Sequence, residues 1–149
     1  MSRMTAVYRA PMRSRRDDID PQASLDRALR LGVVGFGDAG FDERLARRVD
    51  RFADVEDGSF VWTRDADGFY WLGRIDGPYR RDDAADAVAV DLVHVRPCRW
   101  LGEPVLEPDV PPAVLATFGR GGRNFQQTHD RDVGPQTERI WATRSDQGS

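Results

Sequence analysis

The chain has 149 residues, of which 40% are hydrophobic, and carries a formal net charge of −3. This length suits one ordinary domain that buries its own core, and the negative charge excludes the strongly basic composition typical of many polyanion-binding domains. We expect a single domain over residues 1–149, with flexible ends at about 1–4 and 143–149.

The cysteine and arginine content bears on the compartment of the protein and on its ligands. Cys98 is the only cysteine, so no internal disulfide can form, and no apolar run resembles a signal peptide or a membrane span. These features predict a cytoplasmic protein without membrane contact. All 22 basic residues are arginines, which GC-rich codon usage explains, although a guanidinium also suits phosphate. Residues 1–16 hold five arginines and no acid, so this segment is either a basic face or a solvated tail.

The N-terminal half predicts two strands, each followed by a helix. Residues 5–10 form a short β-prone run. The next segment begins with Asp-Pro and ends with glycine, which predicts a helix near 21–31. A glycine-marked apolar strand follows at 33–37, and hydrophobic residues at helical spacing predict a second helix near 41–53.

The second half predicts a hairpin and a further strand. Residues 59–64 and 69–76 flank a turn of sequence DADG, which indicates a β-hairpin. Apolar residues alternate over 88–96, which predicts a strand that Pro97 should end. Gly119 should end a short helix, and Gly121-Gly122 and the polar segment around 126–132 are interpreted as irregular.

This order of elements favours an α+β fold, in which helices flank a curved, mainly antiparallel sheet or small barrel.

Several kinds of catalytic or cofactor site are missing from the sequence. The two histidines, His94 and His129, and the single cysteine show no zinc-ligand spacing. No phosphate-binding glycine loop and no G-x-S-x-G nucleophile motif occurs. We therefore expect no metal, no cofactor and no enzymatic activity.

Three segments together resemble the EVE and YTH-like branch of the PUA-like superfamily. They are GVVGFG at 32–37, FVWTRDADGFYWLGRIDGPYR at 60–80 and DLVHVRPCRWL at 91–101. The resemblance implies a small PUA-like antiparallel β-barrel with flanking helices. Two positions depart from the family pattern: Gly58-Ser59 replaces a Gly-Asp pair, and Phe36 stands where the family has tryptophan.

The same resemblance implies a non-catalytic reader of nucleic acid that holds one modified, flipped-out base in an aromatic pocket at the barrel rim. It favours DNA over RNA and a restriction or defence setting, with a nuclease or other effector as a protein partner. Stacking on an aromatic ring contributes about 1–3 kcal/mol per base, which is comparable to the cost of unstacking the base.

Candidate residues follow from this expectation. The predicted base pocket consists of Phe36, Trp62, Tyr79 and Trp100. The predicted backbone contacts are Arg74, Arg80, Arg96, Arg120 and Arg123. Core packing is the alternative for each aromatic residue, and simple solvation is the alternative for each arginine.

Two rival functions remain open. The chain could be a protein-interaction module or the regulatory subunit of an adjacent nuclease, which its negative charge and short length favour. It could also be a small hydrolase without a recognisable motif. Salt-dependent binding separates a nucleic-acid reader from a protein-binding module, because phosphate contacts release counterions.

Overall fold

The computed structural model describes residues 5–38 and 43–147, and the side chains through residue 145. Its strands are β1 Val7–Arg9, β2 Val33–Phe36, β3 Phe60–Arg64, β4 Tyr70–Ile75, β5 Arg80–Arg81, β6 His94–Trp100 and β7 Gln126–Gln127. Its helices are α1 Pro21–Leu31, α2 Glu43–Asp54, α3 Ala85–Ala89, the short 3-10 helix Glu107–Asp109, α4 Pro112–Gly119 and α5 Val133–Gln147.

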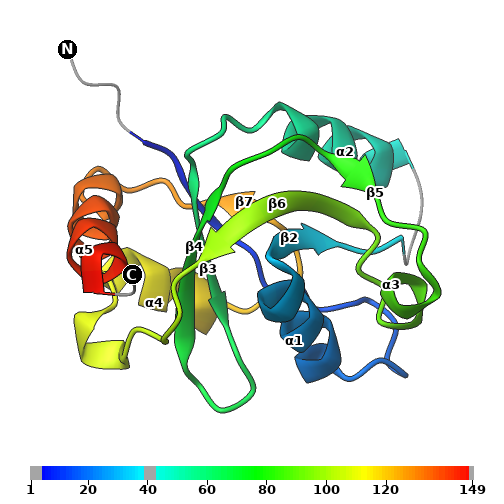
Figure 1. Ribbon diagram of the computed structural model, residues 1–149, viewed down its shortest axis with the longest axis horizontal. Helices are drawn as coiled ribbons and strands as arrows, with labels where there is room; N and C mark the ends of the chain where they lie inside the picture. The colour runs from blue at the N-terminus through cyan, green and yellow to red at the C-terminus, as the bar shows by residue number, and fades with distance from the viewer. Residues whose placement is uncertain (1–4, 39–42, 148–149) are drawn as a thin grey trace.

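The strands form one curled sheet (Figure 1) in the order β2-β6-β4-β3-β1-β7, with β5 also paired to β6. All the pairings are antiparallel except that of β1 with β3, where Val7 lies opposite Phe60. The α+β class and the half-barrel sheet agree with the predicted fold.

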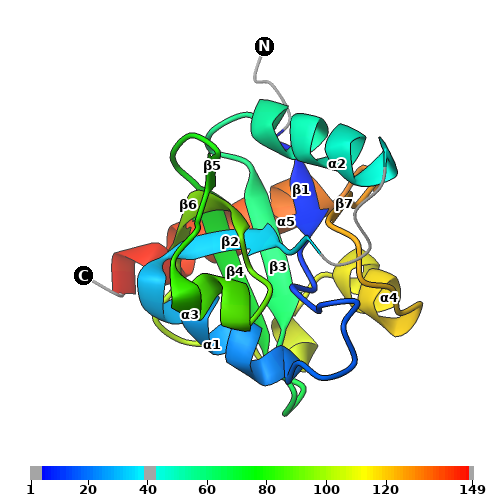
Figure 2. The same cartoon turned by 90° about the vertical axis from the view of Figure 1, so that its right-hand side faces the viewer.

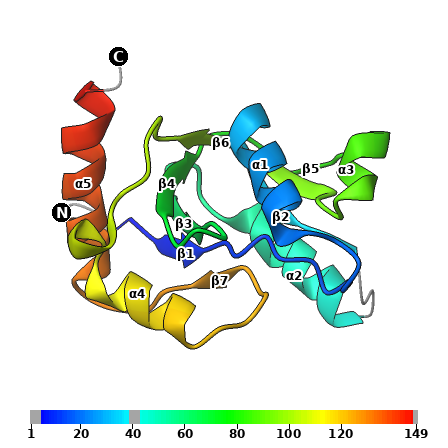
Figure 3. The ribbon, with the colours of Figure 1, turned by 90° about the horizontal axis from the view of Figure 1, so that it is seen from below.

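Helices cover the sheet on two sides. Figures 1 and 3 show α4 and α5 on one side of β3 and β4, and α1, α2 and α3 on the other. Each side has its own hydrophobic core: Leu25, Phe52 and Ile75 belong to the core beside α1 and α2, while Trp62 and Trp141 belong to the core beside α4 and α5. Figure 2 shows that α2 lies above β1 and β7, so that helix and strands frame one face of the molecule.

Local sequence explains the elements that were predicted well. The Asp20 side chain caps α1 by accepting a 2.9 Å hydrogen bond from the backbone N–H of Gln22. Gly32 ends the helix at φ 69°, a conformation that glycine adopts without strain. The predicted hairpin is confirmed, since β3 and β4 pair from Phe60 opposite Arg74 to Arg64 opposite Tyr70. Helix α2 begins at Glu43 and agrees with the predicted helix, whose first residues, 41 and 42, lie outside the described ranges.

The predicted strand over 88–96 is wrong in its first half. Residues 85–89 form helix α3, with Ala87 buried and Val88 exposed, and the strand begins only at His94. Pro97 does not end it, because β6 continues to Trp100. Proline has no N–H to donate, but the carbonyl of Pro97 accepts a 3.0 Å hydrogen bond from the N–H of Asp76, so the strand stays bonded at this position.

The C-terminal region is more regular than predicted. Residues 126–127, in the segment interpreted as irregular, pair with β1 as strand β7. Helix α5 buries Val133, Thr137 and Trp141 against the sheet, and its backbone is helical as far as Gln147. Among the described helices, none combines the length and apolar character needed to cross a membrane.

Candidate functional site

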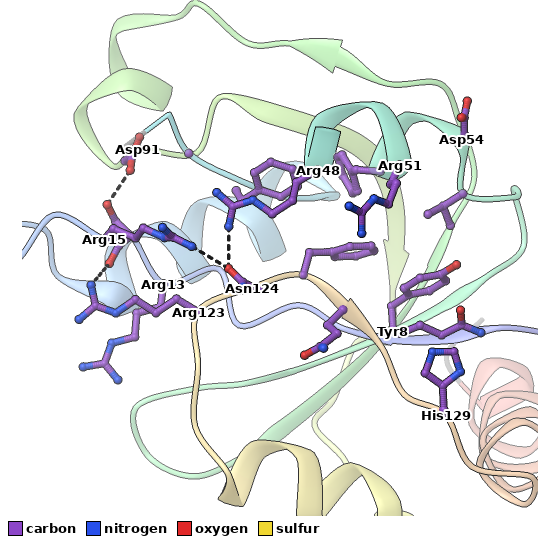
Figure 4. A pocket seen from close by; sticks show the side chains of 18 residues that line it. Tyr8, Arg13, Arg15, Arg48, Arg51, Asp54, Asp91, Arg123, Asn124 and His129 are labelled. Atoms are coloured by element: carbon purple, nitrogen blue, oxygen red, sulfur yellow. Dashed lines mark hydrogen bonds between the residues drawn. The ribbon is translucent and has the colours of Figure 1, made fainter. Parts of the chain in front are cut away.

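A cavity of about 500 Å³, called the main cavity below, opens beside α2 and β7. Five separate segments line it: β1 with the loop that follows, the end of β2, α2 with the residue after it, Asp91 before β6, and residues 123–129 (Figure 4). The volume lies within the range usual for pockets that hold small organic ligands.

Four aromatic side chains form the apolar part of the main cavity. The rings of Tyr8 and Phe125 are stacked, with centroids 5.0 Å apart and planes 12° apart. Phe52 meets Phe125 nearly edge-on at 4.9 Å and meets Phe36 at 5.0 Å. Phe52 is fully buried, whereas the other three are half-buried, so their ring surfaces can contact a ligand. Burial also raises the pKa of the Tyr8 hydroxyl, with the nearby Glu56 carboxylate adding to the rise.

Positive charge surrounds these rings. The main cavity is lined by five arginines and two aspartates, an excess of three positive charges: Arg13, Arg15, Arg48, Arg51, Arg123, Asp54 and Asp91. In Figure 4 the side chains of Arg13, Arg15 and Arg123 gather at one end, and Tyr8 and His129 lie at the other. Such a surface attracts anionic ligands.

Hydrogen bonds hold part of this arginine set in place. The side-chain oxygen of Asn124 accepts from Arg48 at 2.6 Å and from Arg15 at 3.0 Å, which ties α2 to the N-terminal loop. Arg123 donates to the backbone carbonyl of Ser14 at 3.1 Å. The guanidinium groups of Arg13 and Arg51 make no hydrogen bond or ion pair with any of the residues that the structure describes.

Asp91 shapes the wall of the main cavity near Phe36. Its carboxylate accepts from the Ser14 hydroxyl at 2.6 Å and from the backbone N–H of Asp38 at 2.8 Å. A β-carbon at Gly37 would collide with this side chain, so glycine is required for the close approach. Both charged oxygens of Asp91 are therefore occupied within the fold.

A chain of hydrogen bonds lies behind Phe36. The Tyr79 hydroxyl bonds to Nδ1 of His94 at 2.8 Å, and Nε2 of His94 bonds to Asp38 at 2.5 Å. Asp38 also accepts from Arg81 at 2.6 Å. The hydrogen bond from Arg81, followed by that from His94, lowers the pKa of Asp38 below its ordinary value.

The structure brings one of the four predicted pocket aromatics to the main cavity, and that residue is Phe36. Trp62 is fully buried and donates from its indole nitrogen to the Thr137 hydroxyl at 3.2 Å. Tyr79 stacks on His94 with centroids 6.0 Å apart, and Trp100 donates to the carbonyl of Val33 at 3.0 Å. These three residues lie outside the lining, and each already has a partner for its polar atom.

The five predicted backbone arginines also separate. Arg123 lines the main cavity, and Arg120 lines a second cavity on the far side of β7. Arg96 is 3% exposed and donates to the carbonyls of Gly77, Phe52 and Val55 and to Asp57.

The remaining two arginines serve the sheet or its surface. Arg74 donates to the Gly58 carbonyl at 2.8 Å and lies 4.6 Å above the Phe60 ring. Arg80 is exposed and lies 4.0 Å from Asp82.

Sequence reasoning missed most of the lining, in particular Tyr8, Phe52, Phe125, Arg48 and Arg51. Two weak signals could have pointed to part of it. The five arginines of residues 1–16 include Arg13 and Arg15, and Arg48 and Arg51 lie three residues apart on α2, hence on one helix face. Within the described residues, no three His, Cys, Asp or Glu side chains are grouped to hold a metal ion.

Comparison with solved structures identifies the fold, whereas no protein-family model and no curated protein matches the sequence. The chain is similar to the Pho92 YTH domain, solved in complex with m6A, with a TM-score of 0.55 and 8% identity over 94% of this chain and 85% of that chain. It is also similar to the YTH domain of the Zygosaccharomyces rouxii MRB1 protein, solved in complex with N6-methyladenosine RNA, with a TM-score of 0.51 and 12% identity. That match covers 93% of this chain and 86% of the other. Over most of its length, the chain therefore has the fold of a YTH domain, in agreement with the resemblance noted from its sequence.

Proposed function

We propose that this domain is a non-catalytic reader of nucleic acid that holds one modified base in the main cavity. The observation that carries the proposal is the combination of half-exposed rings of Tyr8, Phe36 and Phe125 with a surrounding excess of positive charge. Aromatic faces stack on a base of any sequence, and guanidinium groups contact the phosphates on either side.

The solved neighbours indicate which base to test first. One was solved in complex with m6A and the other in complex with N6-methyladenosine RNA, and a methyl group at N6 of adenine is equally compatible with DNA. Burying one added methyl group contributes about 0.8 kcal/mol, which corresponds to a preference of about fourfold over the unmodified base. N6-methyladenine is therefore the first candidate ligand.

The arginines have a separate task in this proposal. Arg13 and Arg51, whose guanidinium groups bond to none of the described residues, would contact the phosphates together with Arg123. Such contacts carry no sequence information but give the binding its salt dependence. We expect DNA as the polymer and a nuclease or other effector as a protein partner, on the basis of the EVE-like resemblance, with RNA as the alternative polymer.

Binding to fluorescent single strands tests the proposal. Matched DNA and RNA oligonucleotides carry one central adenine, N6-methyladenine, cytosine or 5-methylcytosine, and affinity is measured by anisotropy at several salt concentrations. We expect one modified strand to bind most tightly, and we expect Phe36→Leu to weaken that binding by about 1 kcal/mol or more, because it removes a stacking face.

A matched control keeps this test specific. Phe69→Leu changes an exposed aromatic residue at the hairpin, outside the main cavity, and should leave the affinity unchanged. If no strand binds, or if Phe36→Leu and Phe69→Leu behave alike, the main cavity is not a base pocket.

A further inference from the structure

A second cavity of about 410 Å³ lies against β7 and the C-terminal end of α4. It shares Gln126, Gln127 and His129 with the main cavity, so the two cavities flank the same short strand. Its two basic residues are Arg9 from β1 and Arg120 from the end of α4.

Arg9 is a buried cation without a counterion. It is 7% exposed, and its Nη1 donates to the backbone carbonyls of Thr117 at 2.9 Å and Gly121 at 2.7 Å. Its Nε is buried and has no hydrogen-bond partner. Among the side chains described, those of residues 5–38 and 43–145, no carboxylate pairs with Arg9.

The surroundings make this arrangement costly unless an anion is present. Removing a charge from water carries a penalty that backbone carbonyls offset only in part. Burial lowers the pKa of Arg9, and the positive charge of Arg120 lowers it further. Asp130 also lines the second cavity, but its Oδ1 accepts from the backbone N–H groups of Asp132 and Val133 at the start of α5.

The geometry points to a phosphate-class oxyanion bound in the second cavity between Arg9 and Arg120. Thr117, Gln126 and Thr128 supply further hydrogen-bond donors in the lining. A guanidinium pair of this kind suits a phosphate, because each fork presents N–H groups to two oxygens. The hydrogen bonds from Arg9 Nη1 to the carbonyls of Thr117 and Gly121 would hold the guanidinium group in place before the anion arrives.

Two sources could supply the anion. One is the phosphate of a strand whose base occupies the main cavity, since β7 alone separates the two sites; this source rests on the proposed function. The other is free phosphate, which requires no base pocket. Both share the same chemistry at Arg9 and Arg120.

Inorganic phosphate tests the site without any nucleic acid. Melting temperature is measured as phosphate replaces chloride at constant ionic strength, since a ligand that binds only the folded state stabilises it by an amount that grows with the logarithm of the ligand concentration above Kd. We expect the melting temperature to rise with phosphate concentration for the wild type and for Arg30→Gln, which changes an exposed arginine at the end of α1, and we expect no rise for Arg120→Gln. Arg120 is exposed, so its removal should not unfold the protein.

Replacing single phosphates of an oligonucleotide tests whether the nucleic-acid strand supplies the anion. A preferred oligonucleotide is made with one neutral methylphosphonate at each linkage in turn. One linkage should cost the wild type about tenfold in affinity, which corresponds to a lost charge-assisted hydrogen bond, and should cost Arg120→Gln nothing.

The inorganic phosphate titration and the methylphosphonate scan together distinguish the two sources of the anion. A phosphate effect alone identifies a free anion, and a linkage effect alone identifies the strand. If neither response depends on Arg120, there is no oxyanion site in the second cavity. Failure of the base-reader proposal would instead appear as insensitivity to Phe36→Leu while the inorganic phosphate effect persists.

Discussion

Arg48 donates a 2.6 Å hydrogen bond to the side-chain oxygen of Asn124, and this contact joins helix α2 to the loop before β7 across the main cavity. Arg15 donates to the same oxygen at 3.0 Å, so one neutral acceptor holds two cations side by side (Figure 4). Because the Asn124 amide carries no charge, these two hydrogen bonds do not themselves neutralise either guanidinium group, as a carboxylate acceptor would.

The first prediction concerns a substitution of Asn124, which provides this shared acceptor. Asn124→Asp keeps the shape of the side chain but places a negative charge between Arg15 and Arg48. We expect weaker binding to every oligonucleotide alike and a salt-dependence slope lower by about 0.7, the value for one neutralised contact on a single strand. Anisotropy titrations over a range of salt concentrations measure both quantities.

Gln136→Glu is the matched control for this change. It adds the same charge on α5, outside both cavities, and should alter neither affinity nor slope. Equal effects from the two variants would mean that net charge alone, and not the arginine set of the main cavity, governs binding.

The second prediction concerns Arg96, which was predicted from the sequence to contact phosphate but lies inside the fold. Its guanidinium bonds to the carbonyls of Phe52, Val55 and Gly77 and forms a 2.7 Å ion pair with Asp57. Arg96→Met leaves these buried acceptors without a donor, so we expect a loss of about 3–5 kcal/mol in the free energy of unfolding. Urea denaturation measures this loss.

Arg80→Gln provides the comparison within the same predicted set. Arg80 is exposed, and its ion pair with Asp82 is long, at 4.0 Å, so the change should stay within about 0.5 kcal/mol. Arg96 would have to be reconsidered as a surface contact if Arg96→Met proved as stable as Arg80→Gln.

The third prediction follows from the depressed pKa of Asp38. Its hydrogen bonds to Arg81 and His94 favour the charged carboxylate in the folded state, so the unfolded chain binds a proton at higher pH than the folded one. The stability that these bonds contribute is therefore fully present above the ordinary aspartate pKa of about 4 and is lost as the pH falls below it.

Urea midpoints between pH 2.5 and 6 check this sign. The wild type should lose stability steeply in the acid range, and Asp38→Asn should lose less, because its amide does not titrate. Asp67→Asn, an exposed residue of the hairpin turn, is the matched control and should follow the wild type. A wild-type profile that Asp38→Asn leaves unchanged would contradict the assigned role of the His94–Asp38–Arg81 contacts.

The parts of the fold that the sequence predicts are those with strong local signals. The hairpin of β3 and β4 combines strand periodicity with a turn, and α1 has both a cap and a terminal glycine. The alternation over 88–96 misleads because Val88 is an exposed helical residue. Helix α5 has Gly134 and Pro135 in its first turn and only a few buried residues, so its pattern is weak.

The main cavity is harder to predict because no single segment contains it. Tyr8 comes from β1, Phe52 from α2 and Phe125 from the loop before β7, and only the parallel pairing of β1 with β3 and the antiparallel pairing of β1 with β7 bring these segments together. Phe36 could be found because a family pattern marks its position. Trp62 and Trp100 attract attention as large aromatic residues, but size alone equally favours burial.

The last prediction separates packing from binding at Trp100. Its indole donates to the Val33 carbonyl at 3.0 Å, and its ring covers Gly73, where a β-carbon would lie 2.6 Å from a ring carbon. This wall of the sheet is built around the indole, so Trp100→Ala should lose about 3–5 kcal/mol of folding stability through the lost contacts and the unpaired carbonyl. The fraction that remains folded should bind the preferred oligonucleotide as the wild type does, because Trp100 lies outside the main cavity. Melting temperature and affinity are measured on the same preparation, with Phe36→Leu beside it. Phe36→Leu should show the larger loss of affinity and the smaller loss of stability. If Trp100→Ala instead loses more affinity and less stability than Phe36→Leu, Trp100 belongs to the base pocket.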